Sequence, residues 1–158
     1  MKVGITGHQT LGDAEAWCRT VMQDLVRSLP VTHGYTCLAA GADQLFADIL
    51  CSRGVSFTAV IPSENYARAF ASDAARRHYL ELVQKASDRI SLPFTQPGDA
   101  AYLAASHRVV ASAETLIAIW DGQAAKGLGG TADVVAYARE QGVTVVHCDP
   151  SSRTISRL

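Results

Sequence analysis

The sequence predicts an α/β protein built as a three-layer sandwich, in which helices cover both faces of a central, mainly parallel sheet of about six strands. Short apolar runs rich in β-forming residues alternate with longer helical patterns along the chain. Several of these runs are nearly continuous in apolar residues, as is typical of strands that are covered on both faces. The 158 residues, 48% of them hydrophobic, suit one compact domain. We expect that domain at 1–150.

The individual elements follow from the apolar pattern and from helix start signals. Strands are expected at 2–7, 35–39, 55–62, 89–94, 115–121 and 143–149. Helices are expected between them, at about 13–29, 43–53, 73–86, 98–112 and 130–142. Capping residues are available for the first three helices, namely Asp13, Asp43 and either Ser72 or Asp73.

Two segments have weaker patterns. The segment 63–70 fits either a short helix or an ordered loop, with Tyr66 and Phe70 anchored in the core. The last residues, 151–158, are polar and predict a poorly packed C-terminal tail.

The charge and the cysteines limit the function classes. The net charge is −1 at pH 7, and lysine and arginine are scattered along the chain. Because sequence-independent binding of duplex DNA needs a basic surface, we do not expect a nucleic-acid partner, although this argument does not extend to a short single strand. The four cysteines, Cys18, Cys37, Cys51 and Cys148, form no C-x-x-C pair and are expected to be reduced packing residues. We predict no metal site and no bound cofactor.

The chain has no apolar run long enough to span a membrane, and its first residues fit a strand rather than a signal segment. We therefore expect a cytoplasmic protein with no membrane partner.

The stretch after the fifth expected strand is the strongest candidate for a ligand site. Ligands of parallel sheets bind where the carboxyl ends of strands meet helix N-termini, because unpaired amides and the positive end of the helix dipole lie there. Here the run DGQAAKGLGGT leads into the last expected helix. Gly127, Gly129 and Gly130 leave backbone bare at the helix start and Thr131 adds a hydroxyl, which is typical of a phosphate-binding loop. The alternative is a merely flexible loop, which explains the glycines but not their place.

The run TGHQTLGD after the first strand is a second candidate. Gly7 and Gly12 permit a close approach of the backbone, while Thr6, His8 and Gln9 offer polar groups near a bound phosphate or base. The alternative is a turn that needs glycine only for its own backbone. The run matches neither G-x-G-x-x-G nor G-x-x-x-x-G-K-[ST], which argues against a dinucleotide-binding site and against a P-loop.

The run AAGAD after the second strand is a third candidate. Gly41 makes the turn, and Asp43 either caps the next helix or accepts hydrogen bonds from ligand hydroxyls such as those of a ribose.

Arg108, in the helix before the fifth strand, is the fourth candidate. The apolar pattern of this helix places Leu103, Val110 and Ala111 inward, which leaves Arg108 able to reach a neighbouring loop. A solvated surface arginine is the alternative.

Together these segments resemble a superfamily that joins DNA-processing protein A, the "Lonely guy" (LOG) phosphoribohydrolases and the molybdenum-cofactor carrier proteins, with a nucleotide-binding branch called SLOG. The likeness spans about 2–149 and rests on the runs GITGHQTLG, AAGADQLFADIL, SHRVVASAETLIAIWDG and GLGGTADVVAYA. It implies a modified Rossmann-like fold without the dinucleotide fingerprint, and binding of nucleotides or nucleotide-derived molecules through their phosphates. It also implies a homodimer or a higher homo-oligomer.

The resemblance assigns roles by position. Gly129, Gly130 and Thr131 would hold the phosphate, and Arg108 would meet the phosphate or the ribose. Residues of the first two loops would line the other side of the pocket. The complete predicted ligand-binding set is Gly7, His8, Gly41, Asp43, Arg108, Asp121, Gly129, Gly130 and Thr131.

One departure from the superfamily concerns catalysis. The phosphoribohydrolases carry G-T-x-x-E, and their glutamate is central to cleaving the bond between base and sugar. This chain has Val134 at that position and Asp133 one residue earlier. One residue rotates a helical side chain by about 100°, so Asp133 cannot simply replace the glutamate. Asp121 could still polarise a water at the strand end, which weakens the case for hydrolysis without removing it.

The sequence therefore favours a domain that binds a phosphorylated nucleoside or a nucleotide-derived small molecule, as a sensor or carrier. Whether it is an enzyme is left open. The alternative function is a nucleoside-monophosphate N-glycosidase, in which Arg108 binds the substrate and Asp121 or Asp133 is the catalytic acid or base.

Overall fold

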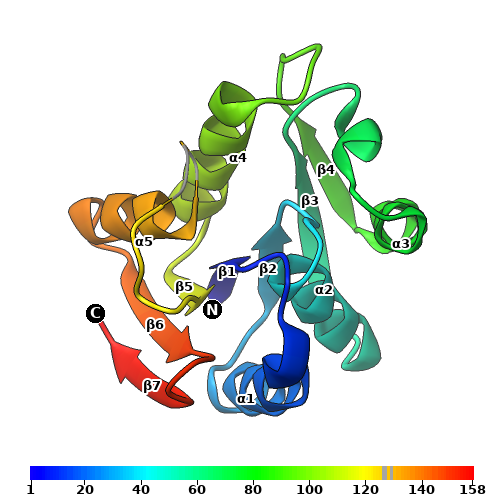
Figure 1. Cartoon of the computed structure of the whole chain (residues 1–158). Helices are drawn as coiled ribbons and strands as arrows, with labels where there is room; N and C mark the ends of the chain where they lie inside the picture. Colours follow the sequence, from blue (N-terminus) through cyan, green and yellow to red (C-terminus); the bar gives the residue numbers. More distant parts are fainter. Residues whose placement is uncertain (126–127, 129) are drawn as a thin grey trace.

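The computed structural model describes residues 1–125, 128 and 130–158 (Figure 1). The strands in this part of the chain are β1 (Lys2–Gly7), β2 (His33–Thr36), β3 (Ser56–Ile61), β4 (Asp88–Ser91), β5 (Thr115–Ile119), β6 (Thr144–Asp149) and β7 (Thr154–Arg157). The α-helices are α1 (Glu15–Ser28), α2 (Ala42–Ser52), α3 (Asp73–Lys85), α4 (Asp99–Ser112) and α5 (Thr131–Glu140). Two short 3₁₀ helices are η1 (Gly12–Ala14) and η2 (Tyr66–Ala69).

One sheet connects all the described strands, in the order β4-β3-β2-β1-β5-β6-β7. Every neighbouring pair from β4 to β6 is parallel, and β7 alone runs antiparallel to β6. Helices α1, α2 and α3 pack along one face, and α4 and α5 pack together on the other (Figure 1). The predicted α/β three-layer sandwich with a mainly parallel sheet is therefore confirmed.

The central strands are apolar for the expected reason, since each has helices on both faces. All five residues of β5 are buried, and so are Val3 and Ile5 of β1. Two core clusters result, one between the sheet and α1 to α3 and the other between the sheet and α4 and α5.

Two strand predictions need correction. The second strand lies at His33–Thr36 rather than 35–39, because Leu38 has a positive φ of 56° and its N–H turns back to donate to Thr36 Oγ1. The residues after Pro150 do not form an unstructured tail, because Thr154–Arg157 pairs with β6. The side chains of β7 are nevertheless all exposed, which is why an apolar pattern could not indicate a strand there.

One predicted helix cap is confirmed and two are wrong. Ser72 caps α3, since its hydroxyl accepts a hydrogen bond of 3.1 Å from the N–H of Ala75. Asp13 lies within η1 and α1 has no side-chain cap. Asp43 lies inside the first turn of α2, where Gly41 is the capping residue.

The buried stripe of α4 also differs from the prediction. Val110 is buried as expected, but Ala111 is exposed, and the buried face is formed by Ala101, Ala105, Val109 and Val110. The residues of α4 itself are small and apolar on nearly all sides of the helix, so its sequence pattern does not identify one buried face.

All four cysteines are free, and Cys18 and Cys148 are fully buried packing residues as predicted. Within the described ranges, no helix combines the length and the apolar content that a membrane crossing requires.

Candidate functional site

A cavity of about 890 Å³ opens at the carboxyl ends of the strands. It lies beside the point where the sheet order reverses, because β1 pairs with β2 on one side and with β5 on the other. Residues after β1, β2, β3 and β5 line it together with the start of α5 and one face of α4. Ligands of open α/β sheets bind at such a position.

Gly7 allows the loop after β1 to begin between its neighbours. A Cβ atom on Gly7 would lie 2.7 Å from the Cβ of Ala42 and 2.8 Å from the Cβ of Ile119, so no side chain fits. The next residue, His8, donates its backbone N–H to the carbonyl of Ile119 at 3.0 Å. This loop is thereby fixed against the end of β5, and Thr6, Gly7, His8, Gln9 and Thr10 line the cavity.

Gly41 joins the same loop to the start of α2. Its φ is +80°, and a Cβ atom there would lie 2.4 Å from the carbonyl oxygen of His8. The N–H of Ala42 donates to that oxygen at 3.1 Å. Gly41 does not line the large cavity but a smaller one of about 270 Å³ beneath the loop, so its observed position is one of loop packing.

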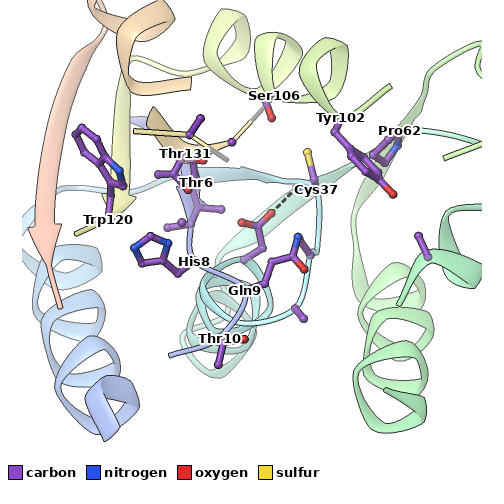
Figure 2. Close-up of a pocket in the computed structure, with 18 of the residues that line it drawn as sticks. Thr6, His8, Gln9, Thr10, Cys37, Pro62, Tyr102, Ser106, Trp120 and Thr131 are labelled. Atoms are coloured by element: carbon purple, nitrogen blue, oxygen red, sulfur yellow. Dashed lines mark hydrogen bonds between the residues drawn. The ribbon is translucent and has the colours of Figure 1, made fainter. Parts of the chain in front are cut away.

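Asp43 forms a buried polar floor of the cavity. Its side-chain Oδ2 accepts a hydrogen bond from the Thr36 hydroxyl at 3.1 Å. It accepts a second one from the Cys37 N–H at 3.0 Å, which is drawn as a dashed line at Cys37 in Figure 2. Burial raises the pKa of Asp43 from 3.8 to about 7, although these donated hydrogen bonds act in the opposite direction. Of the two alternatives for Asp43, capping is therefore wrong, and its contact with a ligand stays a prediction.

The end of β5 supplies Trp120 and Asp121. The backbone N–H of Asp121 donates to His8 Nε2 at 3.0 Å, and the carboxylate Oδ1 of Asp121 lies 3.4 Å from the same nitrogen. Asp121 Oδ1 also accepts from the N–H of Gln123. The indole N–H of Trp120 donates to the carbonyl of Gln123, which holds this strand end in a compact turn.

The start of α5 reaches the cavity through Gly130 and Thr131. Gly130 is the N-cap residue, with φ −66° and ψ 166°, so its backbone is extended and unstrained. As a glycine, Gly130 has no side chain with which to cap this helix. The predicted phosphate contact at Gly129 lies outside the described residues, as do Lys126 and Gly127.

Besides Gly41, two predicted residues lie away from the cavity lining, and so does Val134. Arg108 is exposed on α4, and its predicted contact with a ligand stays a prediction. Asp133 is half-buried on α5 and does not line the cavity. Val134, which the sequence comparison places at the glutamate of the phosphoribohydrolases' G-T-x-x-E pattern, is only 1% exposed and packs in the core between α5 and the sheet.

Sequence reasoning missed the side of the cavity that lies opposite Trp120 and Thr131. Figure 2 shows Pro62 and Tyr102 on that side, facing away from Trp120 and Thr131. Tyr66, Phe70 and Ser106 also line the cavity. The spacing of Tyr102 and Ser106 by four residues, on one helix face, is the signal that could have indicated them.

Comparisons with known proteins concern the fold. No protein-family model matches the sequence, and no curated protein matches it significantly. DNA processing protein A from Streptococcus pneumoniae is similar in structure, with a TM-score of 0.67 and 20% identity over 92% of this chain and 49% of that one. The chain thus spans about half the length of that protein.

Two more solved structures are similar. DNA processing protein A from Helicobacter pylori, described for its single-stranded DNA binding mode, has a TM-score of 0.69 and 15% identity over 96% of this chain and 70% of that one. The molybdenum cofactor binding protein from the phototrophic bacterium Rippkaea orientalis has a TM-score of 0.57 and 16% identity over 92% of this chain and 74% of that one.

These likenesses correct one expectation from the sequence. We did not expect a nucleic-acid partner, because the charge is balanced and the basic residues are scattered. The fold is nevertheless that of a protein known for binding single-stranded DNA, so charge balance is no ground for setting nucleic acid aside. The chain has the Rossmann-like fold that DNA processing protein A and the molybdenum cofactor binding protein share.

Proposed function

We propose that this chain binds a phosphorylated nucleoside or another nucleotide-derived small molecule in the large cavity, as a sensor or carrier in the cytoplasm. One observation carries the proposal: the N-terminus of α5, at Gly130 and Thr131, opens into a cavity at the reversal point of the sheet. The backbone amides and the positive end of the helix dipole favour an anionic group at such a position. The fold shared with a molybdenum cofactor binding protein is consistent with a carrier role.

The described side chains around the cavity offer a phosphate no lysine or arginine. Among the described lining residues, the acidic side chains are Asp43 and Asp121, and His8 is the basic one. A phosphate would therefore be held by backbone amides and by the hydroxyls of Thr6, Thr10 and Thr131 rather than by a cluster of cations.

Calorimetric titration with a nucleoside monophosphate, the matching nucleoside and NAD tests the proposal. We expect the monophosphate to bind more tightly than the other two, because the phosphate contacts α5 and because no dinucleotide fingerprint is present. A clear preference for NAD, or equal binding of nucleoside and monophosphate, would contradict it. Mass spectrometry of small molecules released from the denatured protein would identify a ligand carried through purification.

Two variants test the predicted phosphate contacts separately. Gly130→Ala places a methyl group at the helix start, and because φ is −66° the chain should still fold. Arg108→Ala removes the predicted charge-assisted bond, which would cost roughly 1.5–3 kcal/mol, or about tenfold to over a hundredfold in affinity. Weaker binding by the first variant alone would place the phosphate at α5 and remove Arg108 from the site.

Single-stranded nucleic acid is a second candidate ligand. The observation that favours it is the fold shared with DNA processing protein A, including the Helicobacter pylori protein described for its single-stranded DNA binding mode. Fluorescence anisotropy with a labelled oligothymidylate would measure binding, and the salt dependence would count the phosphates contacted. If the oligonucleotide binds and a monophosphate does not compete, the cavity proposal is wrong.

Hydrolysis of an N-glycosidic bond remains the alternative activity. It is favoured by the position of Asp121, which lines the cavity beside His8. Of the two predicted acid or base residues, only Asp121 lies where a bound ligand could reach it.

A further inference from the structure

The cavity has an aromatic end, formed by Pro62, Tyr66, Phe70 and Tyr102. Tyr66 is the centre of this group, because its ring packs edge-on against Phe70 at 5.2 Å and against Tyr102 at 6.2 Å, centroid to centroid. Tyr66 also packs edge-on against Tyr79 at 5.2 Å, and Tyr79 stacks on Phe70 at 5.0 Å. The aromatic end is thus a fixed structure, anchored in the core before any ligand arrives.

The rings come from two layers of the sandwich. Tyr66 belongs to η2 and follows β3, whereas Tyr102 belongs to α4 on the other face of the sheet. Tyr102 is half-buried and lines the cavity together with Ser106 and Val109, which lie on the same face of α4. A flat group that enters between these layers would meet ring surface and hydroxyls at once.

Polar chemistry connects the aromatic end to the start of α5. Cys37 and Asp43 both line the cavity, and the Cys37 N–H donates to the Asp43 carboxylate. Figure 2 shows Cys37 between Thr6 and Tyr102. The cavity therefore has a helix N-terminus at one end, hydrogen-bonding groups in the middle and aromatic rings at the far end.

We propose that the aromatic end binds the planar base of a nucleotide, with the sugar over Asp43 and the phosphate at Gly130 and Thr131. This inference rests on the proposed function and adds the orientation of the ligand and the residues that recognise the base. An aliphatic group would need no hydroxyls around it, whereas a base has a π-face for the rings and polar edges for hydroxyl groups.

The protonation of the tyrosines agrees with this role. Burial raises the pKa of Tyr66 well above its ordinary value, and burial also raises the pKa of Tyr102. Both phenols are therefore protonated at neutral pH and can donate a hydrogen bond to a ring nitrogen or carbonyl of the base.

Calorimetric titrations with AMP, GMP, CMP, UMP and ribose 5-phosphate test the inference. Ribose 5-phosphate offers the phosphate and the sugar without the base. We expect at least one monophosphate to bind roughly 5- to 100-fold more tightly than ribose 5-phosphate, as base stacking on an aromatic side chain would give. Tyr102→Ala should abolish most of that difference and leave the affinity for ribose 5-phosphate unchanged.

Two further variants keep the result interpretable. Tyr102→Leu retains apolar packing against Tyr66 but offers no ring, so it should also lose the preference for a monophosphate over ribose 5-phosphate. It serves as the test if Tyr102→Ala folds poorly. Tyr137→Ala is the matched control, because Tyr137 is a half-buried ring on α5 that stacks on His107 at 3.7 Å and does not line the cavity. It should bind every probe like the wild type.

The outcomes separate this inference from the proposed function. If ribose 5-phosphate binds as tightly as every monophosphate, or if Tyr102→Leu keeps the preference, the inference is wrong while the phosphate site stands. If no phosphorylated probe binds, the proposed function is wrong and the inference falls with it.

Discussion

The imidazole of His8 accepts a hydrogen bond from the backbone N–H of Asp121, with 3.0 Å between Nε2 and the amide nitrogen. The bond joins the loop after β1 to the end of β5, the two strands that meet where the sheet order reverses. Because Nε2 is the acceptor, the proton of the neutral ring lies on Nδ1. A doubly protonated ring would lose this acceptor.

Substitution of His8 should show what this bond contributes. His8→Leu removes the acceptor and should lower the free energy of unfolding by roughly 0.5–1.5 kcal/mol. His8→Gln places an amide oxygen at similar reach and should lose less. Urea unfolding of the three proteins at pH 7.5 measures the difference, and equal losses for both variants would show that the bond stabilises nothing.

Gly41→Ala should destabilise the protein more than an alanine at another glycine with positive φ. Gly54 is the control, because its φ is +66° and no atom lies within 4 Å of an added Cβ. Gly54→Ala should cost roughly 1–2 kcal/mol through backbone strain alone. Gly41→Ala should cost roughly 1–3 kcal/mol more, because its Cβ would lie 2.4 Å from the His8 carbonyl oxygen. Denaturant unfolding compares them, and equal costs would mean that the two loops are not in close contact.

Asp43 should make stability fall as the pH rises from about 4 to about 7. Its pKa is about 7 in the folded protein and 3.8 is the ordinary value, so between these values the folded state holds a proton that the unfolded state has released. The slope is then negative, on the order of 1 kcal/mol per pH unit within that window. Asp43→Asn replaces the titrating carboxyl group by an amide, so this contribution to the pH dependence of stability is lost. Unfolding free energies of the wild type and the variant should converge toward higher pH or cross, and parallel curves would contradict the raised pKa.

The wild-type protein should release little or no free base from nucleoside monophosphates. Val134 stands where the G-T-x-x-E pattern of the phosphoribohydrolases has its glutamate. It is buried in the core, so no carboxylate reaches the ligand from this position. Chromatography after a long incubation with AMP, GMP, CMP and UMP checks this expectation. Rapid release of base from any of them would instead favour hydrolysis through Asp121, which Asp121→Asn should then suppress.

The strands at the centre of the sheet were predictable because burial on both faces leaves a continuous apolar run, as in β1 and β5. β7 was not, because all its side chains are exposed and its place depends on backbone pairing with β6. The phase of α4 was ambiguous for a related reason. With small apolar residues on most sides, its pattern did not distinguish Ala111, which is exposed, from Val109, which is buried.

The candidate site was predictable where polar residues and glycines directly follow a strand or begin a helix in the sequence. His8, Asp43, Asp121, Gly130 and Thr131 do line one cavity, as their positions after parallel strands suggested. The aromatic end was missed because Tyr66 and Tyr102 lie far apart in the sequence. They come into contact only in the folded protein, where η2 and α4 lie next to each other.

The pairing of β1 with β5 sets the order in which the protein can be completed during synthesis. The N–H of Lys2, at the start of β1, donates to the carboxylate of Glu114, 112 residues further along the chain. During synthesis, β2 and β3 can pair beside β1 early. The other edge of β1, which pairs with β5, stays unpaired until β5 has been synthesised. The cavity wall at Trp120, Asp121, Gly130 and Thr131 is made later still. Whatever the cavity binds therefore meets a chain in which β1 to β5 have already been made, and it cannot assist the folding of β1 to β3 before that point.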